Sequence, residues 1–524
     1  MLKKRNKTHI KQFKFDYMKK FILIFLFTYL NSTAATIYVN ASAVGLNNGT
    51  SWNNAYTNLQ EALSNAIFGD QIWVATGTYK ATTTNDRTIS FVMKNGVNLY
   101  GGFSGVETSI NQRNISSNPT TLSGDIGAIG DNADNTNTII RLTSITSGLT
   151  IDGFRIISGR GSGCAGIALN NNTGIININN CFFFDNFGGT SGAIFLAYQG
   201  NYTVNVFNCD FISNISVNGV IFTDDSNNNL NVSNCRFKGS VSGGITVLDF
   251  LGGNLTFDKC VVTNNTATQS GLFYIDARFS AKISNSLFVG NSFKESALLF
   301  YSSTGISQIM ENVTISHNRK TDLINDFYST IDRANGTFNI YNSIIYQNTN
   351  PPNNGQIRSG NTVTNCIVEN GYSTGTNILN VNPLFVNPNN LVSAPFDCTN
   401  FDYKLQSNSQ GINYGNNSFV TTSQDLENNA RIQQTTVDLG AYENTGNLSI
   451  GESTYINKNL YYDYSNEILI LKNIDSGKIK IYDLTGKLVK TFEIENEISL
   501  SYLKSGVYIV VLQDNNERLK IIKK

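Results

Sequence analysis

Three aspartates occupy equivalent positions in successive segments of the middle of this chain. Asp224, Asp249 and Asp276 each lie five positions after a glycine, at successive spacings of 25 and 27. If the chain repeats with that period, the three carboxylates should be stacked neighbours about 5 Å apart. Asp225 and Arg278 should lie close by. Carboxylates crowded in this way raise one another's pKa or bind a cation.

Two chemistries would use such a row of acids. Calcium prefers carboxylate oxygens, so Asp224, Asp225, Asp249 and Asp276 are candidate calcium ligands, and calcium is the only cofactor indicated. A pair of carboxylates can also supply the acid and base of glycoside cleavage, which makes Asp224, Asp249, Asp276 and Arg278 candidate catalytic residues. The alternative is that these aspartates end their strands and hydrogen-bond to turn amides.

Other catalytic sets find little support in the sequence. The only histidines are His9 and His317, so neither a Ser-His-Asp triad nor a histidine metal site is expected. No Cys-x-x-Cys pair occurs. Five of the seven cysteines share one slot of a repeat that serine or valine fills elsewhere, which indicates a buried stack of reduced thiols. The seven are Cys164, Cys181, Cys209, Cys235, Cys260, Cys366 and Cys398.

The element that must position the aspartates is a repeat whose period varies from 23 to 30 and whose central residue is nearly always asparagine. Apolar residues alternate on each side of this centre but step by three across it, which predicts a tight corner between two short strands. Asparagine and glycine tolerate the left-handed backbone that such a corner needs, whereas Lys259 should be strained there. The predicted corner residues are Gly153, Asn180, Asn208, Asn234, Lys259, Asn285, Asn312, Asn342 and Asn365.

Two strands and a corner, repeated with this period, form one rung of a parallel β-helix. Stacked rungs bury a continuous core that no single rung could bury. The predicted fold class is all-β: a right-handed parallel β-helix (solenoid) with a short N-terminal capping helix, followed by a small C-terminal β-sandwich. The helix is expected within residues 57–67, with Asn58 and Glu61 at the spacing of a capping box. Its apolar stripe would be Leu59, Leu63, Ala66 and Ile67.

Phrases at both ends of the repeat carry a family resemblance. They include Asn48-Gly-Thr-Ser-Trp-Asn-Asn-Ala-Tyr56, Asp70-Gln-Ile-Trp-Val-Ala-Thr-Gly-Thr-Tyr79 and Leu99-Tyr-Gly-Gly-Phe103, with Asp438-Leu-Gly-Ala-Tyr-Glu443 near the end. The chain resembles the pectin-lyase-like right-handed β-helix proteins and, more narrowly, the secreted "choice-of-anchor Q" proteins of bacterial surfaces. The resemblance implies an architecture and a surface location but no particular reaction. The Gly-His-Gly motif of pectin-hydrolysing relatives is missing.

The N-terminus has the pattern of an export signal. Residues 1–35 contain a basic segment, an apolar stretch at 21–30 and small residues at Ala34 and Ala35, near which cleavage is expected. Met18 is an alternative start. The apolar stretch is short for a membrane span. We therefore expect export through the inner membrane.

The C-terminal segment differs from the repeat and alternates apolar with charged residues. Ile481-Tyr-Asp-Leu-Thr-Gly-Lys-Leu-Val489, Leu503-Lys-Ser-Gly-Val-Tyr508 and the basic ending Lys520-Ile-Ile-Lys-Lys524 resemble the type A C-terminal sorting domain of the type IX secretion system in Bacteroidota. The resemblance implies that the secretion machinery is a partner and that the protein is released or attached at the outer cell surface. The predicted domains are 36–445 for the β-helix, 446–464 for a linker and 465–524 for the sorting domain.

The charge composition narrows the possible classes of binding partner further. Residues 36–444 carry 27 acidic and 19 basic residues, a net charge of −8, which argues against a nucleic-acid partner. The sequence therefore predicts a secreted, surface-delivered β-helix with a binding, adhesion-like or structural role, with a glycan or cell surface as its partner. An enzyme is the less favoured alternative. It would be a polysaccharide lyase or glycoside hydrolase that uses the aspartate row.

Overall fold

The computed structural model contains two compact units, residues 1–445 and 446–524, and each is described by itself. Residues 1–33 of the predicted signal peptide lie outside the residues that the structure describes. The structure describes residues 34–197, 200–224, 227–301, 306–322, 328–349, 355–388, 401–444, 460–463, 467–471, 477–512 and 517–523.

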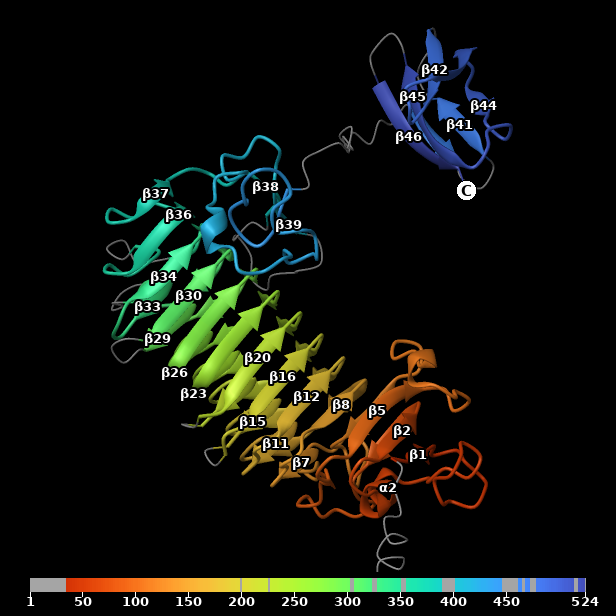
Figure 1. Cartoon of the computed structure of the whole chain (residues 1–524), viewed down its shortest axis with the longest axis vertical. Helices are drawn as coiled ribbons and strands as arrows, with labels where there is room; N and C mark the ends of the chain where they lie inside the picture. Colours follow the sequence, from red (N-terminus) through yellow and green to blue (C-terminus); the bar gives the residue numbers. More distant parts are fainter. Residues whose placement is uncertain are drawn as a thin grey trace, which may run out of the picture. The chain divides into compact units, whose positions relative to one another are not determined.

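The first unit is a parallel β-helix (Figure 1). Each complete rung contributes up to four strands, and each strand pairs in parallel with its counterparts in adjacent rungs, giving four stacks that we name A, B, C and D in chain order. Stack A contains β4 (Phe91–Val92), β7 (Ile140–Thr143), β11 (Ile167–Asn170), β15 (Ile194–Leu196), β19 (Ile221–Thr223), the first part of β23 (Leu248–Asp258) and β26 (Phe273–Ser284), β29 (Leu298–Tyr301) and β33 (Ile331–Arg333). Stack B contains β1 (Thr36–Val39), β2 (Gln71–Ala75), β5 (Asn98–Phe103), β8 (Leu149–Asp152), β12 (Ile175–Asn179), β16 (Thr203–Phe207), β20 (Asn229–Ser233), the second part of β23 and β26, β30 (Ser307–Glu311), β34 (Phe338–Tyr341) and β36 (Thr362–Val368).

Stacks C and D follow the two corners of each rung. Stack C contains β3 (Gly77–Lys80), β6 (Thr120–Ser123), β9 (Phe154–Ile157), β13 (Phe182–Phe184), β17 (Asp210–Ile212), β21 (Arg236–Lys238), β24 (Val261–Thr263), β27 (Leu287–Val289), β31 (Thr314–Ser316) and β35 (Ile344–Tyr346). Stack D contains β10 (Arg160–Gly161), β14 (Phe187–Gly188), β18 (Ile215–Ser216), β22 (Val241–Ser242), β25 (Thr266–Ala267), β28 (Ser292–Phe293) and β32 (Arg319–Lys320).

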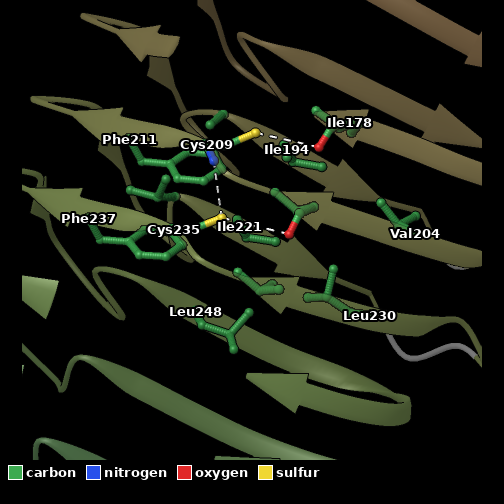
Figure 2. Packing of buried hydrophobic residues seen from close by; sticks show 14 of the residues in the cluster. Ile178, Ile194, Val204, Cys209, Phe211, Ile221, Leu230, Cys235, Phe237 and Leu248 are labelled. Atoms are coloured by element: carbon green, nitrogen blue, oxygen red, sulfur yellow. Dashed lines mark hydrogen bonds between the residues drawn. The ribbon is translucent and has the colours of Figure 1, made fainter. Parts of the chain in front are cut away.

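The interior is a continuous apolar core in which like residues stack on like. Phe183, Phe211 and Phe237 occupy the same position of successive rungs, with ring centroids 4.8 and 4.6 Å apart and nearly parallel planes. Figure 2 shows Phe211 and Phe237 packed beside Ile194 and Ile221 of stack A. Because each rung alone would expose this apolar layer, burial between rungs is what stabilises the solenoid.

The second corner of each rung carries a buried asparagine that the sequence reading missed. Asn265, Asn291 and Asn318 are each fully buried, and each donates its side-chain N–H to the carbonyl oxygen of the next, with distances of 3.0 and 2.9 Å. Each also donates to a backbone carbonyl of the preceding rung, as Asn291 does to Val262. The ladder therefore satisfies the polar backbone where the chain turns inside the core. Asn186, Asn214 and Asn348 hold the equivalent positions in other rungs.

The predicted capping helix is α2 (Leu59–Asn65), the α-helix among the described residues, and it contacts β1, β2 and β4 at the start of the solenoid. Asn58 caps it by accepting a hydrogen bond from the Gln60 backbone N–H. Two details were wrong. The Glu61 side chain accepts from Asn47, 3.0 Å away, and so engages a neighbouring loop. Ile67 is 56% exposed, because the helix ends at Asn65 and the following residue is extended.

Downstream of the last rung, the chain returns across the rungs already formed. After β36 come β37 (Thr376–Leu379), β38 (Phe385–Asn387) and β39 (Asp402–Leu405), and we name residues 401–444 the strap. The strap binds the first corner of the later rungs: Asn342 donates its side-chain N–H to the Asn416 carbonyl, and Asn365 donates to the Tyr414 carbonyl. This fold-back covers the late part of the corner ladder.

The second unit consists of two antiparallel sheets, β40–β41–β44 and β43–β42–β45–β46, which share one apolar core and form a small sandwich. Leu469, Ile479, Ile481 and Val510 are fully buried in it. No helix in the described part of the chain is long and apolar enough to cross a membrane. The strands are β40 (Leu460–Asp463), β41 (Ile468–Leu471), β42 (Lys478–Asp483), β43 (Leu488–Glu493), β44 (Glu497–Ser499), β45 (Gly506–Leu512) and β46 (Glu517–Lys523).

Candidate functional site

Asp249 and Asp276 lie on stack A and Asp224 directly follows β19 of the same stack, but the three aspartates do not form the expected row. Asp249 pairs in register with Phe222 on one side and Tyr274 on the other. Asp276 pairs with Leu251, two positions further along the strand. The constant spacing from glycine predicts the wrong register. Thr246, and not Gly244, holds the position equivalent to Gly271. Asp249 is therefore a diagonal neighbour of the other two acids.

Asp249 has a perturbed carboxyl. Burial, together with the charge of Asp224, raises the pKa of its carboxyl to about 7. Its Oδ1 atom is buried and has no hydrogen-bond partner within the described residues. Burial and the charges of Asp276 and Asp249 also raise the pKa of Tyr274. A carboxyl of raised pKa between Phe222 and Tyr274 is the chemical feature of this face.

Two further residues belong to that prediction. Asp225 lies outside the described residues, and the exposed Arg278 donates a hydrogen bond to the side chain of Asn227. Among the described residues, no group of three or more His, Cys, Asp and Glu side chains is arranged to hold a metal. Calcium binding therefore stays a prediction that this geometry does not strengthen.

The corner residues all adopt the left-handed backbone. Their φ angles run from 45° at Asn285 to 86° at Gly153, and Lys259, at 50°, takes the same conformation as the asparagines. A lysine pays a steric cost there that asparagine and glycine largely avoid. The Lys259 ammonium reaches the strap, 2.7 Å from Asn428 Oδ1 and 3.1 Å from Gln424 Oε1.

On the early rungs, the corner side chains form a directed chain of amides. Asn180 donates to Asp152 at 3.0 Å, Asn208 donates to Asn180 at 2.6 Å, and Asn234 donates to Asn208 at 3.1 Å. Asp152 is itself paired with Arg113, 2.9 Å away. Because an ionised carboxylate can only accept hydrogen bonds, it fixes the orientation of Asn180, and each amide then fixes the next.

This part of the ladder lies in a groove of about 580 Å³, which we name the corner groove. Its floor is formed by the three asparagines and by outward side chains of stack C, Phe182, Asp210, Arg236 and Val261. The loop at Ile115 and Ser116 bounds it at one end. Lys259 and the strap residues Leu426, Glu427 and Tyr442 bound it at the other.

The sequence predicts the asparagines that form the floor of the groove, but it does not predict the groove itself. The asparagines were visible as a repeat, whereas the walls come from segments that lie far away in the chain on either side. The signal that could have found them is the phrase around Asp438 and Tyr442, which was read only as a family marker. It places Ala441 against the solenoid, where its N–H donates to Thr314 Oγ1 at 3.0 Å.

The shared cysteine slot lies directly beneath the ladder. The Cys209 Sγ atom accepts a hydrogen bond from the Cys181 N–H, and Cys235 accepts from Cys209, each at 3.4 Å, as Figure 2 shows for the second pair. Ser286 accepts from the Cys260 N–H in the same way. Cysteine and serine in this slot therefore supply an acceptor atom, which Val313 in the equivalent position does not. All six described cysteines are free and buried, and burial raises the pKa of Cys366 to about 12.

Comparison with known proteins identifies the second unit. Residues 459–524 match the family model described as "Secretion system C-terminal sorting domain". The match begins inside the range expected as a linker, one position before β40. The chain therefore carries a secretion sorting domain at its C-terminus, which supports delivery to the cell surface or beyond.

The comparisons say less about the first unit. No curated protein matches the chain. Among solved structures it is similar to the "Crystal structure of pectate lyase Pel9A", with 16% sequence identity and a TM-score of 0.49, over 79% of this chain and 97% of that chain. The parallel β-helix described above rests on this chain's own strand pairing. The narrower resemblance to the choice-of-anchor Q proteins stays a prediction.

Proposed function

We propose that the protein is delivered to the cell surface by the type IX secretion machinery and binds carbohydrate in the corner groove. The observation that carries this proposal is the open amide ladder in a hollow of about 580 Å³. Sugar-binding surfaces need hydrogen-bonding groups in fixed positions beside apolar surface. The ladder supplies the first, and Phe182, Ile115 and Leu426 supply the second.

The ladder is preorganised for this role. Asn208 is exposed and is held on both sides, because its amide donates to Asn180 and accepts from Asn234. Its backbone conformation is also fixed by the corner. Little side-chain entropy therefore remains to be lost when a ligand binds.

Affinity electrophoresis of the full chain against a panel of soluble polysaccharides tests the proposal. We expect at least one polysaccharide to retard the protein, and Asn208→Gly to weaken that binding about tenfold. Glycine keeps the left-handed corner, so the loss reports the amide. Asn171→Gly is the matched control, because Asn171 is also left-handed and exposed but does not line the groove. Retardation by no polysaccharide, or equal binding by both variants, overturns the proposal.

A second candidate function is favoured by Asp249. Burial raises the pKa of this carboxyl to about 7 beside a second acid, Asp224, and a glycoside-cleaving enzyme uses an acid of raised pKa to protonate the leaving group. Incubation of the full chain with the same panel, followed by reducing-end and ultraviolet absorbance assays, would detect a hydrolase or a lyase. Product formation that Asp249→Asn abolishes supports this function, and no product from any polymer rejects it.

A further inference from the structure

We infer that the corner groove selects an uncharged polysaccharide and discriminates against polyuronates and other anionic polymers. The inference rests on the proposed function, since it names the class of ligand for the same groove. It follows from the partners that the charged side chains of the groove already have within the protein.

The two charges at the centre of the floor neutralise each other. Asp210 and Arg236 are register partners on stack C, and the guanidinium contacts both carboxylate oxygens at 2.6 Å. Such a bidentate pair uses the planar donor face of arginine that would otherwise bind a carboxylate of a ligand. The pair raises the pKa of Arg236, with the hydrogen bond to Asp210 as the main cause.

The two charges at the strap end are also engaged. The Lys259 ammonium lies between two amide oxygens of the strap, those of Gln424 and Asn428. Glu427 accepts from Lys404, 3.1 Å away. The charged residues that line the groove are thus two acids and two bases, each with a partner inside the protein.

An anionic polymer would find poor compensation in this setting. A polyuronate brings one carboxylate per sugar, and each would need a free cation or a metal ion where it leaves water. Residues 36–444 carry a net charge of −8, so the long-range field also opposes its approach. The Arg155 guanidinium is exposed but lies outside the lining and is stacked 4.7 Å from the Phe182 ring centroid.

An uncharged sugar chain matches the hydrogen-bond donors and acceptors that the groove leaves available. A side-chain amide has two N–H donors and two carbonyl lone pairs. Asn208 uses one of each within the ladder, which leaves one donor and one acceptor for a ligand. Neighbouring rungs repeat at about 4.8 Å. A hydroxyl can both donate and accept, so an extended neutral chain along the ladder can bond at successive rungs.

The test compares neutral and anionic polymers with the same full-length protein. Affinity electrophoresis would use hydroxyethylcellulose, glucomannan and xyloglucan against polygalacturonate and alginate, at low and at about tenfold higher NaCl concentration. We expect retardation by a neutral polymer that changes less than about twofold with salt. We expect polyuronate binding to be at least about tenfold weaker.

A gain-of-binding variant sharpens the test. Asp210→Asn removes the carboxylate that occupies Arg236, so it should increase affinity for polygalacturonate several-fold relative to the wild-type protein. Asp185→Asn is the control, because Asp185 forms an ion pair with Arg160, 2.8 Å away, outside the groove.

The outcomes separate the two claims. Preferential, salt-sensitive binding of a polyuronate by the wild-type protein, lost in Asn208→Gly, overturns the inference and keeps the proposed function. Absence of binding to every polymer overturns both. No gain of polygalacturonate binding in Asp210→Asn also counts against the inference, because the blocked arginine is its central premise.

Discussion

Arg431 and Glu443 form a buried ion pair inside the strap, with Nη2 and Oε1 2.6 Å apart and each side chain only 1% exposed. Arg431 also donates to the backbone carbonyls of Asp438 and Ala441, so the guanidinium ties together the end of the strap. Burial raises the pKa of Glu443 to about 7, while the charge of Arg431 opposes that rise. Three residues of the strap, Leu426, Glu427 and Tyr442, line the corner groove.

Removing Arg431 should loosen the strap. In Arg431→Met the buried Glu443 carboxyl loses its cation and the Asp438 and Ala441 carbonyls lose their donor, which costs about 3–5 kcal/mol. We expect a lower melting temperature and earlier proteolysis within 401–444 than in the wild-type protein. Lys404→Met is the control, because the Lys404–Glu427 pair is exposed and worth at most about 1 kcal/mol. An Arg431→Met protein as stable as this control would contradict the role of the pair.

Asp249 should make stability depend on pH. Its pKa is raised from 3.8 to about 7 in the folded protein, so between those values the folded state holds a proton that the unfolded state releases. Stability should therefore fall as pH rises from about 4 to about 7, by up to about 1.4 kcal/mol per pH unit. Asp249→Asn should remove this dependence and be the more stable protein above that range.

Melting temperatures at about pH 5 and about pH 8 check this expectation for Asp249→Asn against the wild-type protein. Glu61→Gln serves as the control, because the Glu61 side chain lies in an exposed contact with Asn47. Parallel pH profiles for the wild-type protein and Asp249→Asn would show that Asp249 titrates as an ordinary surface acid.

The cysteine slot should accept serine more readily than alanine. In Cys209→Ser the hydroxyl can still accept from the Cys181 N–H, as Ser286 does from Cys260. In Cys209→Ala the buried N–H loses that partner, which costs about 1–3 kcal/mol. Urea unfolding should therefore rank the wild-type protein and Cys209→Ser above Cys209→Ala. Equal loss in both variants would mean that volume alone governs the slot.

The buried asparagine ladder should be among the most sensitive parts of the core. Asn291 Oδ1 accepts from both the backbone and side-chain N–H groups of Asn265, each at 3.0 Å. Asn291→Ala leaves both donors buried without this acceptor, so we expect a loss of about 2–4 kcal/mol. Asn291→Ser should cost less, because Ser240 fills the same position in another rung and accepts from the Asn214 N–H. Thermal unfolding of the two variants measures the difference.

The corners could be predicted from sequence because their requirement is local. A left-handed residue between two strands restricts the side chain at that position alone, so Asn208 and its equivalents stand out in a single chain. The second ladder carried an equally local signal, since Asn291 follows the corner residue Asn285 by six positions and other rungs repeat that offset. This six-residue offset was enough to predict the second ladder, which the sequence analysis did not do.

The aspartate row and the groove depend on register and on long-range contacts, which a local sequence pattern does not determine. Stacking of Asp249 on Asp276 was inferred from chain spacing, but the turn before each stack A strand absorbs residues, so equal spacing does not guarantee equal register. The groove depends on contacts such as that of Asn342 with Asn416, which joins residues 74 positions apart. No periodic pattern encodes a contact of that kind.

The amide ladder is built from units that are added whole. Most rungs contribute one corner asparagine, and the run in the corner groove from Asn180 to Asn234 ends where Lys259 turns to the strap. Duplication or deletion of one repeat segment would lengthen or shorten this run by one amide while every other contact kept its chemistry. Under the proposed function, the length of ligand that the groove holds would therefore change in steps of one amide.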